Sequence, residues 1–240
     1  MRKTISILMK KRGTAAVIFL SVIAAMFIFL VNLQPESKST TSTALERPVL
    51  VIDAGHGGID GGAVGVDGSK ESDINLAIAL RLCAACDFFG LNSVMTRVDD
   101  SRGSDPLTYS EHAELVYRTE LANSVENAVL MSIHQNCYPT AQPSGPQVLF
   151  SNNESSKRFG QLTHSNLVSK LDPENRRLAE PDNTKIYILE NARCPAILVE
   201  CGFVSNHTDI TKLSSGAYQT ALSTVLMASF IQYTYDKSII

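Results

Sequence analysis

Three apolar segments of the sequence each lead to a side chain that can bind a metal ion or move a proton. His56 follows the segment VLVIDAG, His134 ends AVLMSIH, and Glu200 ends AILVE. Short, continuous apolar runs of this kind are typical of the buried strands of an α/β sheet. Ligands of such sheets bind beyond the carboxyl ends of the strands. We therefore expect the three side chains to meet at one edge of a sheet.

Glu71 joins this group because it opens a predicted helix after the glycine-rich segment 55–70 and can point back towards that segment. Two imidazoles and a carboxylate leave one position of a tetrahedral zinc open for water. A second carboxylate nearby can act as the base. Each residue also has a purely structural alternative. Glu71 could be a first-turn acid that interacts favourably with the helix dipole, and His56 could be a loop residue held by the backbone. His134 and Glu200 could have structural roles in the core.

Other motifs with known chemistry are missing from the sequence. The glycine-rich segment has neither the G-x-G-x-x-G spacing nor the Gly-Lys-Ser/Thr ending of phosphate-binding loops. No G-x-S-x-G nucleophile elbow and no H-E-x-x-H zinc motif is present. The remaining histidines, His112, His164 and His207, lie in polar segments and are expected at the surface.

The surrounding segments alternate between predicted strands and helices, which favours a single α/β domain whose sheet is covered by helices on both faces. From Glu71 to Phe89 apolar residues recur every three or four positions, as on one side of a helix, and Gly90 supplies the stop. Strands are predicted at 48–53, 91–97, 128–134, 147–151, 185–189 and 196–200, and helices at 71–89, 110–124, 156–171 and 217–233.

The amino terminus is predicted to be a membrane anchor rather than part of this domain. Residues 13–34 contain no charged side chain, and their length matches the roughly 20 apolar residues that a helix needs to cross a bilayer. Five basic residues precede them, so the positive-inside rule places the domain outside the cytoplasm. A cleaved signal peptide is the alternative, and it would export the domain too. The expected organisation is an anchor at 1–34, a Ser/Thr-rich linker at 35–46 and a domain at 47–240.

Composition and charge exclude several classes of protein. Of the 240 residues, 44% are apolar and 19% are charged, as in globular proteins. Beyond residue 36 there are 16 basic and 23 acidic residues, a net charge of −7, which makes nucleic acid an unsuitable partner. The five cysteines are scattered and odd in number, so no disulfide framework is predicted.

Four motifs between residues 48 and 233 resemble those of the zinc-dependent N-acetylmuramoyl-L-alanine amidases of the amidase 3 family. VIDAGHGGIDGGAVG is similar to the opening strand and first zinc-binding histidine of the family, here His56. Glu71 matches the glutamate ligand, and MSIHQN contains the second zinc-binding histidine, His134. LVECGFVSN is similar to the segment with the catalytic glutamate, here Glu200.

The resemblance implies a mixed six-stranded sheet flanked by helices, one zinc ion, and a defined reaction. The bond cleaved would be the amide between the lactyl group of N-acetylmuramic acid and the first L-alanine of the peptidoglycan stem peptide. Zinc held by His56, Glu71 and His134 would activate water and polarise the amide carbonyl. Glu200 would take the proton of the water and deliver it to the departing amine.

Within this family, the short domain is most similar to the sporulation amidases that act with a deacetylase to make muramic lactam in the spore cortex. It has no long helical insertion between residues 145 and 195 of the kind that blocks the site of the activator-controlled cell-division amidases. The expected partners are peptidoglycan strands, the membrane through the anchor, and an accessory lipoprotein or deacetylase. Two alternatives stay open: a zinc hydrolase of another wall bond, such as a peptide cross-link or an acetamide, and a non-catalytic wall-binding regulator.

Overall fold

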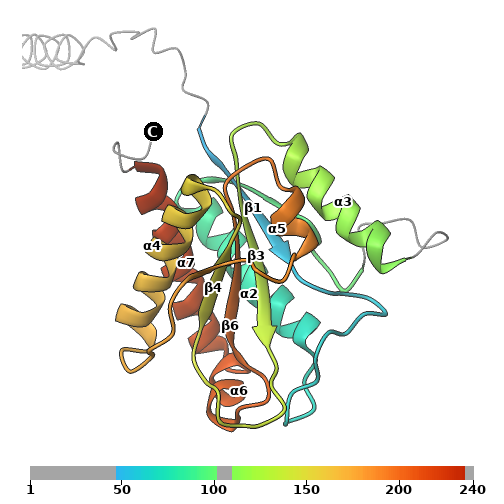
Figure 1. Ribbon diagram of the computed structural model, residues 1–240, viewed down its shortest axis with the longest axis vertical. Coiled ribbons are helices and arrows are strands. Elements are labelled where there is room, and N and C mark those ends of the chain that lie inside the picture. Colours follow the sequence, from blue (N-terminus) through green and yellow to red (C-terminus); the bar gives the residue numbers. More distant parts are fainter. Residues whose placement is uncertain (1–46, 102–109, 236–240) are drawn as a thin grey trace, which may run out of the picture. The chain divides into compact units, whose positions relative to one another are not determined.

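The computed structural model describes residues 47–101 and 110–235, whose strands form one mixed sheet of six strands (Figure 1). β4 runs antiparallel to β6, while the other neighbouring strands pair in parallel. The expected mixed six-stranded sheet is confirmed. In their order across the sheet the strands are β2 (Asn92–Met95), β1 (Val49–Ala54), β3 (Ala128–Asn136), β6 (Ala196–Phe203), β4 (Gln147–Phe150) and β5 (Glu180–Pro181).

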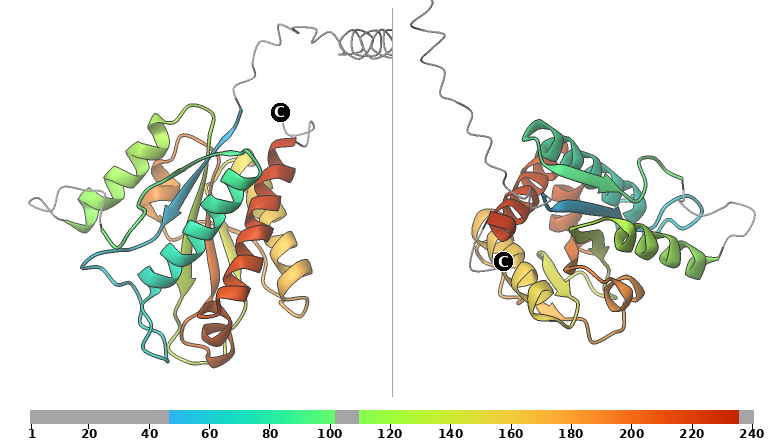
Figure 2. Two further views of the ribbon diagram at one scale, coloured as in Figure 1. Left: turned by 180° about the vertical axis from the view of Figure 1, so that it is seen from behind. Right: turned by 90° about the horizontal axis from the view of Figure 1, so that it is seen from above.

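Helices cover both faces of this sheet, as the sequence predicted (Figure 2). One face packs against α2, α4 and α7, and the other packs against α3 and α5. The short helix α6 lies beside β6 and α7. The helices are α2 (Glu71–Phe88), α3 (Glu111–Ser124), α4 (Glu154–Leu171), α5 (Tyr187–Asn191), α6 (His207–Leu213) and α7 (Gly216–Tyr235).

Successive residues of the central strands point into different cores. In β1, Leu50 and Ile52 pack with α2, α4 and α7, whereas Val51 packs on the side of α3 and α5. All three side chains are fully buried. Because both faces of the strand are covered, its sequence is a continuous apolar run rather than an alternating one. The apolar run ends at Ile52, and the first polar side chain of the strand, the buried Asp53, follows it directly.

One predicted strand, at 185–189, is wrong: this segment enters helix α5. The β-branched and aromatic residues of KIYIL favoured a strand. However, the carboxylate of Asp182 accepts hydrogen bonds from the backbone N–H groups of Thr184, at 2.9 Å, and Ile186, at 2.6 Å. Lys185 adopts a left-handed conformation with φ of 63°. These contacts turn the chain, so that a helix starts at Tyr187. The short elements β5 and α6 were not predicted either.

The predicted anchor at 1–34 and linker at 35–46 lie outside the described residues. Within the part of the chain that the structure describes, no helix has the length and apolar character needed to cross a membrane. All five cysteines are free: Cys86 and Cys201 are buried, whereas Cys137 is exposed. The cysteines therefore add no covalent constraint to the domain.

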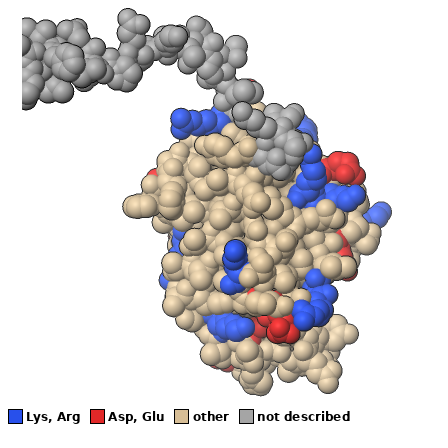
Figure 3. All heavy atoms as spheres, turned by 90° about the vertical axis from the view of Figure 1, so that its left-hand side faces the viewer, with Lys and Arg blue, Asp and Glu red and all other residues tan. Residues whose placement is uncertain are grey.

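The side of the domain that carries α4 shows basic side chains separated by uncharged surface and flanked by acidic ones (Figure 3). Lys157 and Glu154, both in α4, form an exposed ion pair at 3.5 Å. Such pairs contribute little to stability, because solvent screens them. Among the described residues on this side, the charges form no continuous patch of one sign. The carboxyl ends of β1 and β3 are therefore the better candidate site.

Candidate metal centre

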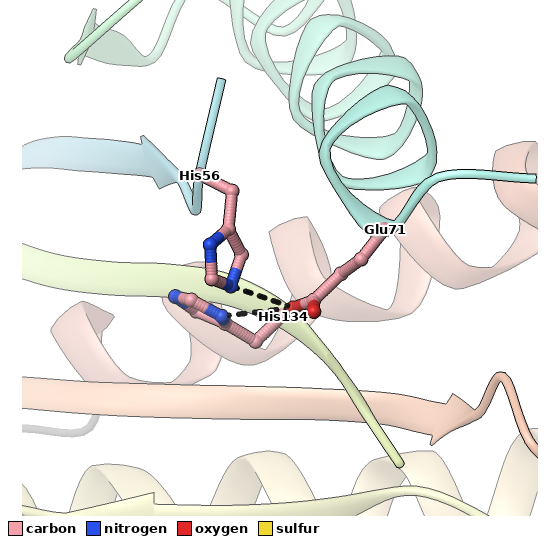
Figure 4. A group of neighbouring side chains, drawn as sticks. All are labelled: His56, Glu71 and His134. Atoms are coloured by element: carbon pink, nitrogen blue, oxygen red, sulfur yellow. Dashed lines mark hydrogen bonds and ion pairs between the residues drawn. The ribbon is translucent and has the colours of Figure 1, made fainter. Parts of the chain in front are cut away.

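Three of the four predicted site residues come together at the carboxyl ends of β1 and β3 (Figure 4). His56 lies two residues beyond β1, Glu71 is the first residue of α2, and His134 lies in β3. A ligand atom of each residue lies within 4.8 Å of those of the other two. Among residues 47–101 and 110–235, this is the group of His, Cys, Asp and Glu side chains that could hold a metal ion.

Glu71 stands between the two histidines. Its Oε1 lies 3.3 Å from Nε2 of His56 and 3.0 Å from Nδ1 of His134. A tetrahedral zinc with bonds of about 2.0 Å separates its ligand atoms by about 3.3 Å. The imidazole rings meet edge to face, with their centroids 5.0 Å apart. Both the donor types and their spacing therefore fit a zinc ion.

The carboxylate of Glu71 is held in place by its neighbours. Its Oε2 accepts a hydrogen bond from the backbone N–H of Ala63 at 3.0 Å, and its Oε1 accepts one from that of Gln135 at 3.1 Å. The amide of Asn75 lies 3.4 Å from the same Oε1 and also donates to the carbonyl of Gly55. Burial alone would raise the pKa of Glu71, but the two histidines outweigh it and hold this pKa well below its usual range. The carboxylate is thus ionised and aimed at the histidines.

His56 occupies an unusual backbone conformation. Its φ is 61°, in the left-handed region that few residues other than glycine adopt. The guanidinium of Arg118 donates a 2.6 Å hydrogen bond to its carbonyl, and Oδ2 of Asp60 lies 2.7 Å from its Nδ1. Burial alone would lower the pKa of His56, but Glu71 and Asp60 outweigh it and raise this pKa to about 9. Without a metal ion, both nitrogens of the His56 ring are therefore protonated at neutral pH. A metal cation would have to displace one of these protons in order to bind.

His134 is positioned by close packing against the loop after β1. A side chain at Gly55 would place its Cβ only 2.3 Å from Cε1 and Nε2 of the His134 ring. Only glycine lets the imidazole lie so near the backbone here. The glycine at position 55 therefore determines how close the ring of His134 can lie to the loop after β1.

Glu200 lies next to His134 on the neighbouring strand β6, where the two residues are paired in register. Their side chains consequently point to the same side of the sheet. Both residues and His56 line a cavity of about 240 Å³. Oε2 of Glu200 is buried without a hydrogen-bond partner among the described residues. Burial raises the pKa of Glu200 to about 7. The charge of His134 opposes this rise, and the negative charge of Glu71 adds to it.

The apolar part of this cavity explains the burial of Glu200. Four side chains from α3, β6 and the start of α5 line it: Leu115, Ile186, Ile188 and Leu198. They keep water from the carboxyl group, which disfavours its charged form. A carboxyl whose pKa lies near neutrality can both accept and return a proton in one reaction cycle.

The structure also changes the interpretation of the other histidines. His112 and His207 are exposed, as expected. The prediction for His164 is wrong, because this residue is buried in α4 and its Nε2 lies 2.8 Å from the carbonyl oxygen of Arg177. The segment after α4 folds back over it, which the polar sequence around His164 did not indicate.

Three residues that support the site were missed as such by sequence reasoning: Asp60, Asn75 and Arg118. Asp60 carried the clearest signal, since it is a carboxylate four positions after His56 in the same loop. Asn75 lies one helical turn after Glu71. Arg118 is 62 positions from His56, and no spacing in the sequence connects the two.

Comparison with known proteins gives consistent results. The model of the Amidase_3 family, described as N-acetylmuramoyl-L-alanine amidase, matches residues 50–231. The uncharacterized protein YqiI of Bacillus subtilis is 34% identical over 196 residues, covering 80% of this chain and 87% of that protein. The germination-specific N-acetylmuramoyl-L-alanine amidase of the same organism is 28% identical over 241 residues, covering 95% and 98%. Among solved structures, the CwlD amidase from Clostridioides difficile, in complex with the GerS lipoprotein, aligns with a TM-score of 0.74 at 29% identity, covering 78% of this chain and 98% of that chain.

Proposed function

Because this chain belongs to the Amidase_3 family of N-acetylmuramoyl-L-alanine amidases, we propose that it works through a zinc ion held by His56, Glu71 and His134, with Glu200 as the catalytic residue. The protein is a hydrolase of the amide between N-acetylmuramic acid and L-alanine in peptidoglycan. One observation supports the proposed site above all others: two imidazoles and a carboxylate converge beside Glu200, whose Oε2 is buried without a hydrogen-bond partner among the described residues.

Each of these residues has a task that follows from its position. When bound there, zinc supplies a Lewis acid that lowers the pKa of water and polarises the amide carbonyl. Glu200 takes the proton of the attacking water and passes it to the departing nitrogen of L-alanine. This second transfer matters as much as the first, because an amine leaves poorly unless it is protonated. A pKa of about 7 lets one carboxyl group serve in both transfers.

The biological setting is a finer proposal. We propose a role in wall remodelling or in muramic lactam synthesis in the spore cortex, which is supported by the nearly full-length match to a germination-specific amidase. The solved CwlD amidase is in complex with a lipoprotein, which supports an accessory lipoprotein for this chain too. We further propose that residues 1–34 export the domain and hold it at the outer side of the membrane, where peptidoglycan and a deacetylase partner would be accessible.

The test is mass spectrometry of purified peptidoglycan, both intact and stripped of its stem peptides, after incubation with the zinc-loaded full chain. We expect free stem peptides that begin with L-alanine, and only from the intact substrate. Glu200→Gln should keep its zinc and lower the rate by about 10²- to 10⁴-fold, the usual contribution of a general acid or base. The matched control is Glu190→Gln, which changes an exposed glutamate of α5 and should retain full activity.

The alternatives predict different fragments. Peptides cut at a cross-link, or glycans that have lost an acetyl group, would assign another wall bond to this zinc site. No fragments from a zinc-loaded chain would favour a non-catalytic wall-binding regulator. Equal activity of Glu200→Gln and the unmodified chain would remove Glu200 from the mechanism.

A further inference from the structure

Asp60 contacts the nitrogen of the His56 ring that faces away from Glu71. Its Oδ2 lies 2.7 Å from Nδ1, while Nε2 on the other side of the ring lies 3.3 Å from Oε1 of Glu71. A neutral imidazole carries its proton on one nitrogen and a lone pair on the other. A carboxylate beside Nδ1 keeps the proton there, because Nδ1–H can donate to it. The lone pair is then left on Nε2, which faces the metal centre.

The carboxylate of Asp60 is fixed by the loop that carries it. The backbone N–H of Gly57 donates to the carbonyl of Asp60 at 2.8 Å, and that of Asp60 donates to the carbonyl of Gly57 at 3.1 Å. Oδ1 accepts a further hydrogen bond from the backbone N–H of Gly62 at 3.0 Å. An ion pair that leaves its aspartate 38% exposed is usually weak, partly because both side chains must be ordered. Here the loop has already ordered the carboxylate.

The loop is also shaped around both ligands. Gly62 has a φ of 65°, and a Cβ at this position would lie 2.7 Å from Oε2 of Glu71 and 2.7 Å from Cδ2 of His56. The glycine thus lets the turn that holds Asp60 pack directly against the metal centre. Asp60 and the two ligands therefore form one continuous unit of side chain and backbone.

The two histidines differ in how they are held. His134 lies within strand β3 and packs against Gly55, so its ring position is set by the sheet. His56 lies in a loop in the left-handed conformation, where neither a strand nor a helix orients its ring. Within the described residues, Glu71 is the carboxylate that pairs with His134, whereas His56 pairs with both Glu71 and Asp60. The additional carboxylate, that of Asp60, thus contacts the histidine that lies outside any helix or strand.

We propose that Asp60 is a positioning residue of the metal centre: it orients the ring of His56 and holds the proton on Nδ1, so that Nε2 is free to bind zinc. The inference rests on the proposed zinc amidase function and adds a residue outside the predicted ligand set. Carboxylates that accept the remaining N–H of a metal-binding histidine raise its basicity and fix its tautomer, and their removal typically weakens metal binding by about 10- to 100-fold.

The experiment compares zinc affinity, by competition with a chelator, for the full chain and its variants. Asp60→Ala should bind zinc about 10- to 100-fold more weakly. Asp60→Asn keeps the size of the side chain and an oxygen acceptor, so its loss should be smaller. The matched control is Asp67→Asn in the same loop, because Asp67 accepts hydrogen bonds from Ser69 and Ser214 instead of from a histidine. Its zinc affinity should equal that of the unmodified chain.

A second readout reports on the ring itself. In the zinc-loaded full chain with ¹⁵N-labelled histidine, His56 should show a protonated Nδ1, identified by sequential assignment of its ring resonances. This signal should broaden or disappear in Asp60→Ala and persist in Asp67→Asn. A residue that only stabilised the fold would lower the unfolding temperature of the metal-free chain without changing this signal.

The outcomes separate this inference from the proposed function. Unchanged zinc affinity and an unchanged Nδ1 signal in both Asp60 variants would overturn the role of Asp60 and leave the zinc site intact. Failure of the unmodified chain to bind zinc would overturn the proposed function instead. If Asp60→Ala does not fold, the affinity of Asp60→Asn decides, and a value equal to that of Asp67→Asn would refute the proposal.

Discussion

Two clusters of buried charge lie beside the carboxyl end of β1, and they are built in opposite ways. In the first, which we call the Asp53 cluster, Arg118 pairs with Asp53 at 3.1 Å and with Glu114 at 3.0 Å. The remaining oxygen of Asp53 accepts a hydrogen bond from Ser132 at 2.5 Å, and Thr96 donates to the other at 2.7 Å. Both oxygens of the Asp53 carboxylate therefore accept hydrogen bonds from protein groups. The Asp53 cluster is therefore complete without a ligand.

The second cluster, formed by His56, Glu71, His134 and Glu200, is not complete in this sense. Glu71 supplies one carboxylate to two imidazoles, and Glu200 adds a second carboxyl whose Oε2 is buried without a hydrogen-bond partner in the part of the chain that the structure describes. Buried polar atoms are nearly always paired, so the exceptions need an explanation. The explanation we favour is that water and substrate complete this cluster during the reaction. The contrast distinguishes charges that stabilise the fold from charges kept for chemistry.

The complete cluster holds the incomplete one in place. Arg118 donates from the Asp53 cluster to the carbonyls of Ala54 and His56, at 2.9 and 2.6 Å. Arg97 donates to the carbonyls of Ala54 and Gly55, at 2.9 and 3.1 Å. Two rigid guanidinium groups thus fix three consecutive carbonyls of the loop that carries the first histidine. A rigid support of this kind is what a metal site of defined geometry requires.

The largest effect is expected from removing a ligand of the second cluster. His134→Ala should abolish both zinc binding and amidase activity, because the two remaining ligands cannot hold the ion in a catalytic geometry. Metal content and peptide release measure the two losses. The matched control is His164→Ala, which removes another buried imidazole but leaves the metal centre untouched. Zinc retained at full stoichiometry in His134→Ala would contradict the ligand assignment.

Removing the cation of the first cluster should act mainly on stability. Arg118→Met leaves Asp53 and Glu114 buried without their counter-charge, and breaking a buried pair in this way typically costs about 3 to 5 kcal/mol. Urea unfolding of the metal-free chain measures the loss. As a control, Arg176→Met breaks an exposed pair with Glu174, also at 3.1 Å, and should change the unfolding free energy by less than about 1 kcal/mol. Equal losses in the two variants would show that burial of the Asp53 cluster is unimportant.

How much of each cluster the sequence could predict follows from how its residues are positioned. His134 and Glu200 end continuous apolar runs, and such runs mark buried strands whose carboxyl ends meet. Glu71 opens a helix with clear periodicity. These three candidate site residues could therefore be predicted together, because each depends on one regular element, and His56 could be added because it closely follows the apolar run of β1.

The Asp53 cluster and the supporting contacts could not be predicted in this way. Arg118 meets Asp53 across 65 positions and is connected to it only by the packing of α3 on the sheet. Helix α5 was missed because its start depends on side chain to backbone hydrogen bonds of Asp182, which compete with the strand-like pattern of its sequence. The left-handed φ of His56 depends on contacts from distant elements as well. Local patterns thus predicted the chemical groups but not what holds them.

Zinc should stabilise the chain only through the second cluster. A ligand that binds the folded state alone stabilises it by about 2.7 kcal/mol at a concentration 100 times its Kd. The unfolding temperature of the unmodified chain and of Glu200→Gln should therefore rise with added zinc, while that of His134→Ala should not. Thermal scans with and without chelator measure this shift. A zinc-dependent rise in His134→Ala would place the ion elsewhere.

The smallest effects concern the pH dependence of stability. The contribution of Asp53, in the first cluster, should increase with pH, whereas that of Glu200, in the second, should decrease. Burial alone would raise the pKa of Asp53, but Arg118 and the hydroxyls of Ser132 and Thr96 hold it below its ordinary value of 3.8. The ionised carboxylate consequently stabilises the fold above that value, and this contribution is lost as the pH falls through the lower folded pKa. The difference in unfolding free energy between the unmodified chain and Asp53→Asn should therefore be full at neutral pH and shrink below about pH 3.8.

Glu200 should act in the opposite direction in the metal-free chain. Its pKa is raised from 4.5 to about 7, so between these values the folded state keeps a proton that the unfolded chain has released. Stability should then fall as the pH rises through this range. Glu200→Gln cannot ionise and should escape that loss, becoming more stable relative to the unmodified chain from pH 4.5 to about 7. Urea unfolding in the presence of chelator, at pH steps across both ranges, measures the two differences. Curves of the same sign for Asp53→Asn and Glu200→Gln would refute the distinction between a cluster that stabilises the fold and one that carries an energetic cost for catalysis.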